Sequence, residues 1–228
     1  MQNNRKLQIS TAGSRKSTHW PRCEIMWSEF TEKLKTPIRG TETLEQYLAL
    51  PKARQDDLKD VGGFVGGTFT GDRRKPECAE GRDLLTLDLD NIPAGQADDV
   101  LRRVGGLGCA AAVYSTRKHA GYSPRLRVIV PTDRTTTADE YEPAVRKLAS
   151  LIGIEFCDPT TFEINRLMYW PSASTYMRCT TIRSAAWTAC WACTATGGTS
   201  ASGLRFRGPK QSSADGWQSK RIPQSNAA

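Results

Sequence analysis

The sequence predicts an α/β (α+β) protein, with a mixed sheet and flanking helices. Three observations support this fold class. Strand and helix patterns alternate between residues 84 and 172, residues 85–90 alternate strictly between apolar and polar side chains, and residues 137–152 carry one apolar helical stripe. The chain has 228 residues and is 38% hydrophobic, which is enough for one substantial core.

The first third of the chain predicts scaffold elements. Residues 7–10 are typical of a short strand, and Trp27, Phe30 and Leu34 recur at helical spacing before Pro37 ends the helix. Two further short helices are expected near 44–48 and 52–59. Residues 61–67 are glycine-rich but lack the Lys and Ser or Thr of a phosphate-binding loop, so they predict a flexible turn.

The acidic strand at 84–90 is the first segment with potential chemistry. Side chains two apart on a strand share a face, so Asp88 and Asp90 lie together while the leucines point the other way. Two carboxylates roughly 7 Å apart suit a hard divalent cation between them. The alternative is a polar strand face that leads into a turn.

The remaining elements are expected in the order helix, strand, strand, helix, strand. They cover 96–104, 109–114, 124–131, a helix that starts after a capping box at 137–140, and 166–172. Pro143 is unfavourable inside a helix, so the fourth of these is expected to start a few residues late. On the strand 124–131, Arg125 and Arg127 share a face.

Polar residues on or after several of these elements, taken together with the acidic strand, suit one reaction, a metal-assisted phosphoryl displacement. His119 follows the strand 109–114, the arginine pair lies on the next strand, and Asp158 precedes Pro159. Three carboxylates can hold two divalent metals in a phosphoryl displacement, and guanidinium groups fork onto phosphate oxygens. Taken singly, each has a plain interpretation as a loop residue, a strand-face ion pair or a turn opener.

The motif order resembles the archaeo-eukaryotic primase superfamily. The resemblance is to the primase-polymerase domain that phages and integrated elements place ahead of a virulence-associated-E-type helicase, and it spans about residues 7–174. It is carried by Leu87-Asp88-Leu89-Asp90, Ser115 with His119, the Pro-Arg-x-Arg strand at 124–131, Asp158, and the strand ending in Pro171-Ser172.

The resemblance implies roles for individual residues. It implies that Asp88, Asp90 and Asp158 bind Mg²⁺ or Mn²⁺ and that His119 is catalytic. The residues implied to bind the nucleotide are Ser115, Arg125, Arg127 and Arg166. The usual Ser-x-His spacing is wider here, and Glu155 and Glu163 are alternatives to Asp158 as the third acid.

The implied activity is template-directed nucleotidyl transfer, by a DNA primase or polymerase, in replication of a phage or mobile element. The expected partners are a single-stranded DNA template, nucleoside triphosphates and a helicase of the virulence-associated-E type. The alternatives are an inactive nucleic-acid-binding accessory module, a truncated pseudogene product, and a metal-dependent nuclease built on the same acids.

Charge and composition predict a domain boundary near residue 177. From Met177 onward there are seven basic residues and one acid, so this segment carries most of the net charge of +8. We therefore expect a catalytic domain at 1–176 and a disordered or aberrant tail at 177–228. Segments 196–203 and 214–228 can each be encoded so that a one-base shift gives a family-like sequence, which predicts a frameshift.

No apolar leader or membrane run is evident, so a cytoplasmic protein with reduced cysteines is expected.

Overall fold

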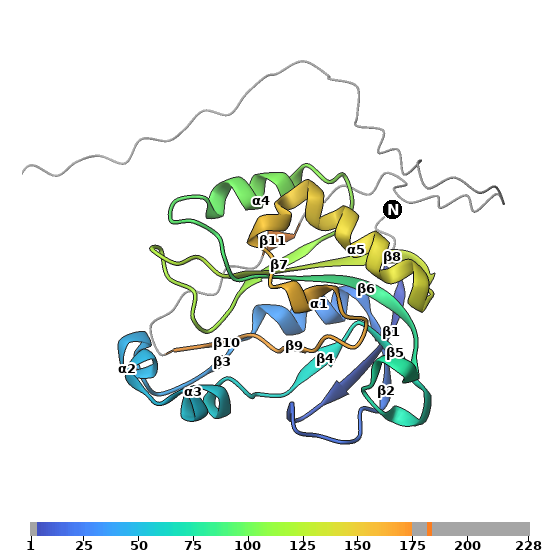
Figure 1. Cartoon of the computed structure of the whole chain (residues 1–228), viewed down its shortest axis with the longest axis horizontal. Helices are drawn as coiled ribbons and strands as arrows, with labels where there is room; N and C mark the ends of the chain where they lie inside the picture. The colour runs from blue at the N-terminus through green and yellow to red at the C-terminus, as the bar shows by residue number, and fades with distance from the viewer. Residues whose placement is uncertain (1–3, 175–181, 184–228) are drawn as a thin grey trace, which may run out of the picture. The chain divides into compact units, whose positions relative to one another are not determined.

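A computed structural model describes residues 4–174 and 182–183, and Figure 1 shows the arrangement of its elements. Its centre is a five-stranded sheet with the order β11-β7-β8-β6-β5. The strands are β11 (Ile182–Arg183), β7 (Ala112–Ser115), β8 (Leu126–Thr136), β6 (Ala79–Leu89) and β5 (Gly67–Phe69). The expected α/β class with flanking helices is confirmed, but the expected mixed sheet is wrong, because every strand pair of this central sheet is antiparallel.

The acidic strand lies in the middle of this sheet as β6, antiparallel to β8. The register places Leu87 opposite Val128 and Asp88 opposite Arg127. Leu85, Leu87 and Leu89 all join one buried cluster, so the predicted alternation of faces is confirmed. Asp88 and Arg127 lie on the opposite face of the sheet.

Two helices cover the leucine face, above the sheet in Figure 1. They are α4 (Ala97–Gly105) and α5 (Ala138–Ile152), and their apolar side chains pack on the leucines of β6. The expected late start of α5 is wrong, because the helix begins directly after the Thr137 capping box. Pro143 lies inside it on the exposed side, where the carbonyl that loses its amide partner can face water.

The other face of the central sheet packs on α1 (Trp27–Lys35) and a second sheet, below it in Figure 1. This sheet has the order β2-β1-β4-β9. Its strands are β2 (Arg22–Met26), β1 (Lys6–Ala12), β4 (Gly63–Val65) and β9 (Met168–Tyr169). Phe30, Phe64 and Trp170 contact one another at the centre of this layer.

The glycine-rich segment 61–67 forms two strands, so the predicted flexible turn is wrong. β4 belongs to the second sheet and β5 to the central sheet, and the chain crosses between them at Gly66. A Cβ at Gly67 would collide with the backbone carbonyl of Gly81 on β6. The glycines therefore permit close strand packing rather than flexibility.

The strand expected at 166–172 is divided in two by Pro171. Met168–Tyr169 forms β9, whereas Ser172–Ala173 forms β10 and pairs in parallel with β3 (Ile38–Arg39). Proline cannot donate a backbone hydrogen bond, so it separates the two ladders. Helices α2 (Leu44–Ala49) and α3 (Lys52–Leu58) follow β3. Short 3-10 helices lie at Thr70–Asp72, Pro76–Cys78, Ile154–Phe156 and Pro159–Phe162.

The predicted domain boundary at 176/177 lies outside the described residues, as do both segments that predict a frameshift. The described pair Ile182–Arg183 forms β11, antiparallel to β7. Within the described part of the chain, no helix combines the length and the hydropathy needed to cross a bilayer.

Candidate functional site

Asp88 and Arg127 form a nearly buried ion pair at the centre of the site. They lie opposite each other on β6 and β8, and Nε and Nη2 of Arg127 donate to the two carboxylate oxygens at 3.3 Å each. Only 4% of Asp88 and 9% of Arg127 is exposed. Burial alone would lower the pKa of Arg127, but the Asp88 carboxylate raises it on balance.

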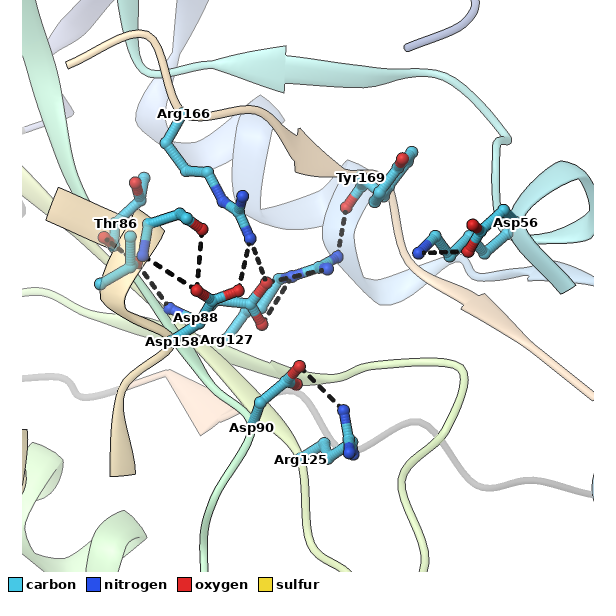
Figure 2. A network of polar contacts seen from close by, with 12 residues as sticks. Asp56, Thr86, Asp88, Asp90, Arg125, Arg127, Asp158, Arg166 and Tyr169 are labelled. Carbon is cyan, nitrogen blue, oxygen red and sulfur yellow. Dashed lines mark hydrogen bonds and ion pairs between the residues drawn. The ribbon is translucent and has the colours of Figure 1, made fainter. Parts of the chain in front are cut away.

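Asp158 comes next to this pair through backbone and side-chain contacts. Its amide donates to the carbonyl of Asp88 at 2.8 Å. Its carboxylate accepts from Thr160 and, at 2.8 Å, from Nη2 of Arg166, which also lies 3.7 Å from Oδ2 of Asp88. Burial alone would raise the pKa of Asp158, but these hydrogen bonds and the Arg166 charge lower it on balance. Figure 2 shows Arg166 between the two carboxylates.

Asp90 lies just beyond the end of β6 and contacts a different arginine. Nη1 of Arg125 is 2.8 Å from its Oδ2, and both side chains are about one-third exposed. Burial, and next the negative charge of Asp88, raise the pKa of Asp90.

The structure brings the three predicted acids into one neighbourhood, and the choice of Asp158 over Glu155 and Glu163 as the third acid stays a prediction. Glu155 and Glu163 are exposed and make no ion pair with the central arginines. In the described ranges 4–174 and 182–183, no three His, Cys, Asp or Glu side chains are grouped closely enough to form a metal site. Each of the three aspartates instead contacts an arginine.

A small pocket of about 120 Å³ opens beside Asp90, and we call it the lysine pocket. Its charged lining consists of Asp90 and six basic side chains, namely Lys52, Lys59, Arg117, Lys118, Arg125 and Arg127. Lys52 and Lys59 share the carboxylate of Asp56 at 3.0 and 2.9 Å. Lys118 forms no ion pair within the described residues, and its pKa is lowered by burial first and then by the neighbouring cations. The pocket is therefore suited to an anion.

The loop that carries Lys118 is fixed to the segment before α2 by a buried ion pair. Arg117 donates to the carboxylate of Glu42, which precedes α2, and its guanidinium lies 5.1 Å from the centre of the Tyr47 ring. Both partners are largely buried. This contact holds the 116–119 turn against α2 and thereby shapes one wall of the lysine pocket.

A larger opening of about 490 Å³ lies beside Asp88, and we call it the arginine groove. Its charged lining is Arg15, Lys16, Lys59, Arg74, Arg127 and Arg166, with Asp88 and Glu163 as the acids. Lys59, Arg127 and Tyr169 line both openings. The two carboxylates of one strand face are thus divided, with Asp90 in the lysine pocket and Asp88 in the arginine groove.

Three predicted residues do not line either opening, namely Asp158, Ser115 and His119. Ser115 is buried in β7 opposite Leu126. His119 closes a turn by donating its amide to the Thr116 carbonyl, and its Nδ1 accepts from the Arg125 amide at 3.1 Å. Burial lowers the pKa of His119. In this structure its ring supports the backbone at Arg125, and its catalytic role stays a prediction.

Arg125 lines the lysine pocket, Arg166 lines the arginine groove and Arg127 lines both, and their predicted contacts to a nucleotide stay a prediction. The sequence reasoning missed Lys52, Lys59 and Lys118. The first two lie on or beside a short helix with no motif, and Lys118 lies between Ser115 and His119, the two residues of the predicted motif. The excess of basic residues over acids in 116–119 was the one sequence feature that indicated an anion-binding role for Lys118.

The comparisons with known proteins support the family. The structure is similar to the AEP domain of the cyanophage S-2L primase-polymerase, at 11% identity, a TM-score of 0.39 and 72% coverage of each chain. That likeness is too low to support residue assignments. A search of curated proteins found no match. A family model described as the VapE N-terminal domain matches residues 1–187, most of the chain. The protein therefore belongs to the VapE N-terminal domain family.

Proposed function

We propose that this domain catalyses template-directed nucleotidyl transfer, as a DNA primase or polymerase in the replication of a phage or mobile element. The observation that carries the proposal is the division of the Asp88–Asp90 face between two basic openings. A reaction that joins a nucleotide to a strand needs two polyanions to meet at one acidic centre. Family membership and the resemblance of the motifs support the same conclusion.

The lysine pocket is suited to the triphosphate of the incoming nucleotide. Arg125 and Arg127 present guanidinium groups, which fork onto phosphate oxygens, and Lys118 adds an ammonium group without a carboxylate partner in the described residues. Tyr47 and Tyr169 give the same pocket aromatic surface. The chain's own residues would thus bind and orient the nucleotide next to Asp90.

The proposed cofactor is Mg²⁺ or Mn²⁺. Asp88, Asp90 and Asp158 would hold it after their carboxylates leave the arginines that they contact in this structure, since carboxylate oxygens are the ligands that these cations prefer. The raised pKa of Asp90, caused by burial and by the Asp88 charge, fits a site that gains from added positive charge. When bound, such a cation stabilises negative charge on the attacking and leaving oxygens of a phosphoryl transfer.

The proposed substrates are nucleoside triphosphates and a single-stranded DNA template. A replicative helicase of the virulence-associated-E type is the proposed partner, in keeping with a family described as an N-terminal domain.

The test is nucleotide incorporation on a single-stranded template with Mn²⁺ or Mg²⁺. Wild type is compared with Asp88→Ala plus Asp90→Ala, and with a control, Asp98→Ala plus Asp99→Ala, that removes two acids from α4. We expect incorporation in wild type and control and none in the first variant. Synthesis that persists in that variant would refute the proposal. Binding without synthesis in wild type would indicate an accessory module, and degradation without incorporation a nuclease.

A further inference from the structure

The arginine groove contains a guanidinium group whose charge is not balanced. Arg74 donates to the carbonyl of Asn165 at 3.2 Å, and its guanidinium lies 5.1 Å from the ring centre of Trp20. It forms no ion pair with any described residue, and Glu163, an acid of the same groove, interacts with it only at long range. A half-buried cation held by a carbonyl and a ring, without a carboxylate, is positioned for an external anion.

Other donors of the groove are also incompletely used. The Nε atoms of Arg74 and Arg166 are buried and have no hydrogen-bond partner among residues 4–174 and 182–183. Arg166 shares its Nη2 between Asp88 and Asp158, so its charge lies directly beside the central acids. The protein therefore does not satisfy all donors of these two guanidinium groups, both of which line the groove.

The connection between β1 and β2 adds two more cations to the groove. Arg15 lies 3.7 Å from Asp56 and 3.9 Å from Asp60, and Lys16 lies 3.3 Å from Asp57. Long, partly exposed pairs of this kind contribute little energy and exchange readily. A phosphate can therefore replace these carboxylates at small cost.

We propose that the arginine groove binds the phosphates of a single polynucleotide strand that leads to Asp88. The cations come from five separate chain segments, around residues 15, 59, 74, 127 and 166, and they surround a space about four times the volume of the lysine pocket. Several cations over such a space suit a run of phosphates rather than one. Trp20 is fully buried beneath Arg74 and offers no stacking surface. Contacts to phosphates carry no sequence information, so we expect binding that does not depend on base sequence. This inference rests on the proposed function, since that function is the reason why the bound strand would lead to Asp88.

The test is fluorescence anisotropy of the full chain with a 5′-labelled oligodeoxythymidylate of about twenty nucleotides at several salt concentrations. Two groove variants are compared with wild type, Arg74→Ala and Arg15→Ala plus Lys16→Ala. The matched control is Arg102→Ala, because Arg102 is 75% exposed and lies on α4, on the other face of the central sheet. The basic segment after residue 176 is the same in all four proteins.

We expect each groove variant to weaken binding about tenfold and to lower the slope of log K against log salt by about 0.7 for each phosphate that the variant no longer neutralises. The control should bind as wild type does, and an oligodeoxycytidylate should give the same pattern. Arg74→Lys keeps the charge and should retain the slope. Unchanged affinity in the groove variants, or an equally large decrease in Arg102→Ala, would overturn the inference. Nucleotide incorporation, measured separately, decides the proposed function whichever way the binding result falls.

Discussion

Replacing Arg127 with leucine leaves the Asp88 carboxylate nearly buried without its main counter-charge. At the observed 3.3 Å, two unit charges in an effective dielectric of about 20 attract by about 5 kcal/mol. Breaking a buried pair by removing one partner costs about 3–5 kcal/mol. Arg166 remains 3.7 Å from Asp88 and offsets part of the missing charge. We therefore expect Arg127→Leu to lower the free energy of unfolding by about 3 kcal/mol.

Urea unfolding followed by tryptophan fluorescence measures this change. Arg134→Leu is the control on the same strand, because Arg134 forms an exposed pair with Glu140 and should cost less than about 1 kcal/mol. Adding Asp88→Asn to Arg127→Leu removes the unpaired charge and should restore about half of the stability that Arg127→Leu removes. If the double variant is no more stable than Arg127→Leu alone, the electrostatic explanation is wrong.

Three further predictions concern other parts of the chain. Hydrogen bonding to Arg134 lowers the pKa of Glu140 from 4.5 to about 2. The ionised carboxylate therefore stabilises wild type relative to Glu140→Gln above pH 4.5, and this difference in the free energy of unfolding should vanish as the pH falls to 2. Unfolding curves measured at a series of acidic pH values test this. Arg117→Ala removes the pair that holds the 116–119 turn, and calorimetric titration should show weaker nucleotide binding with unchanged oligonucleotide binding. Thermal unfolding should show that Gly67→Ala destabilises the fold by about 2 kcal/mol, whereas Gly13→Ala, which meets open space, is neutral or slightly stabilising.

The sequence was most informative where one residue pattern decides both local structure and burial. The strict alternation at 85–90 correctly predicted which faces Leu87 and Asp88 occupy, because a strand has only two faces. The capping box at Thr137 set the start of α5 even with Pro143 in the second turn. A cap acts on donors that would otherwise be unpaired, whereas this proline removes one hydrogen bond on an exposed side.

Contacts between distant segments could not be predicted in this way. Lys52 and Lys59 reach the site because β3 pairs with β10 and brings the following helices beside Asp90. No periodicity within 52–59 encodes that pairing. The prediction for the glycines at 61–67 was wrong for a similar reason, since the close approach of Gly67 to Gly81 depends on a strand from elsewhere in the chain.

The segment from Arg166 to Ser172 has a consequence for how the two openings respond to ligands. Within seven residues it supplies Arg166 to the arginine groove, Tyr169 to both openings and Ser172 to the lysine pocket. The Tyr169 carbonyl also accepts from Nη1 of Arg127, as Figure 2 shows. A ligand that shifts this segment from one side also moves a wall of the other opening, and thermodynamic linkage makes any resulting change in affinity equal in both directions. On the proposed assignment of the two openings, strand binding and nucleotide binding would be coupled through these seven residues of backbone.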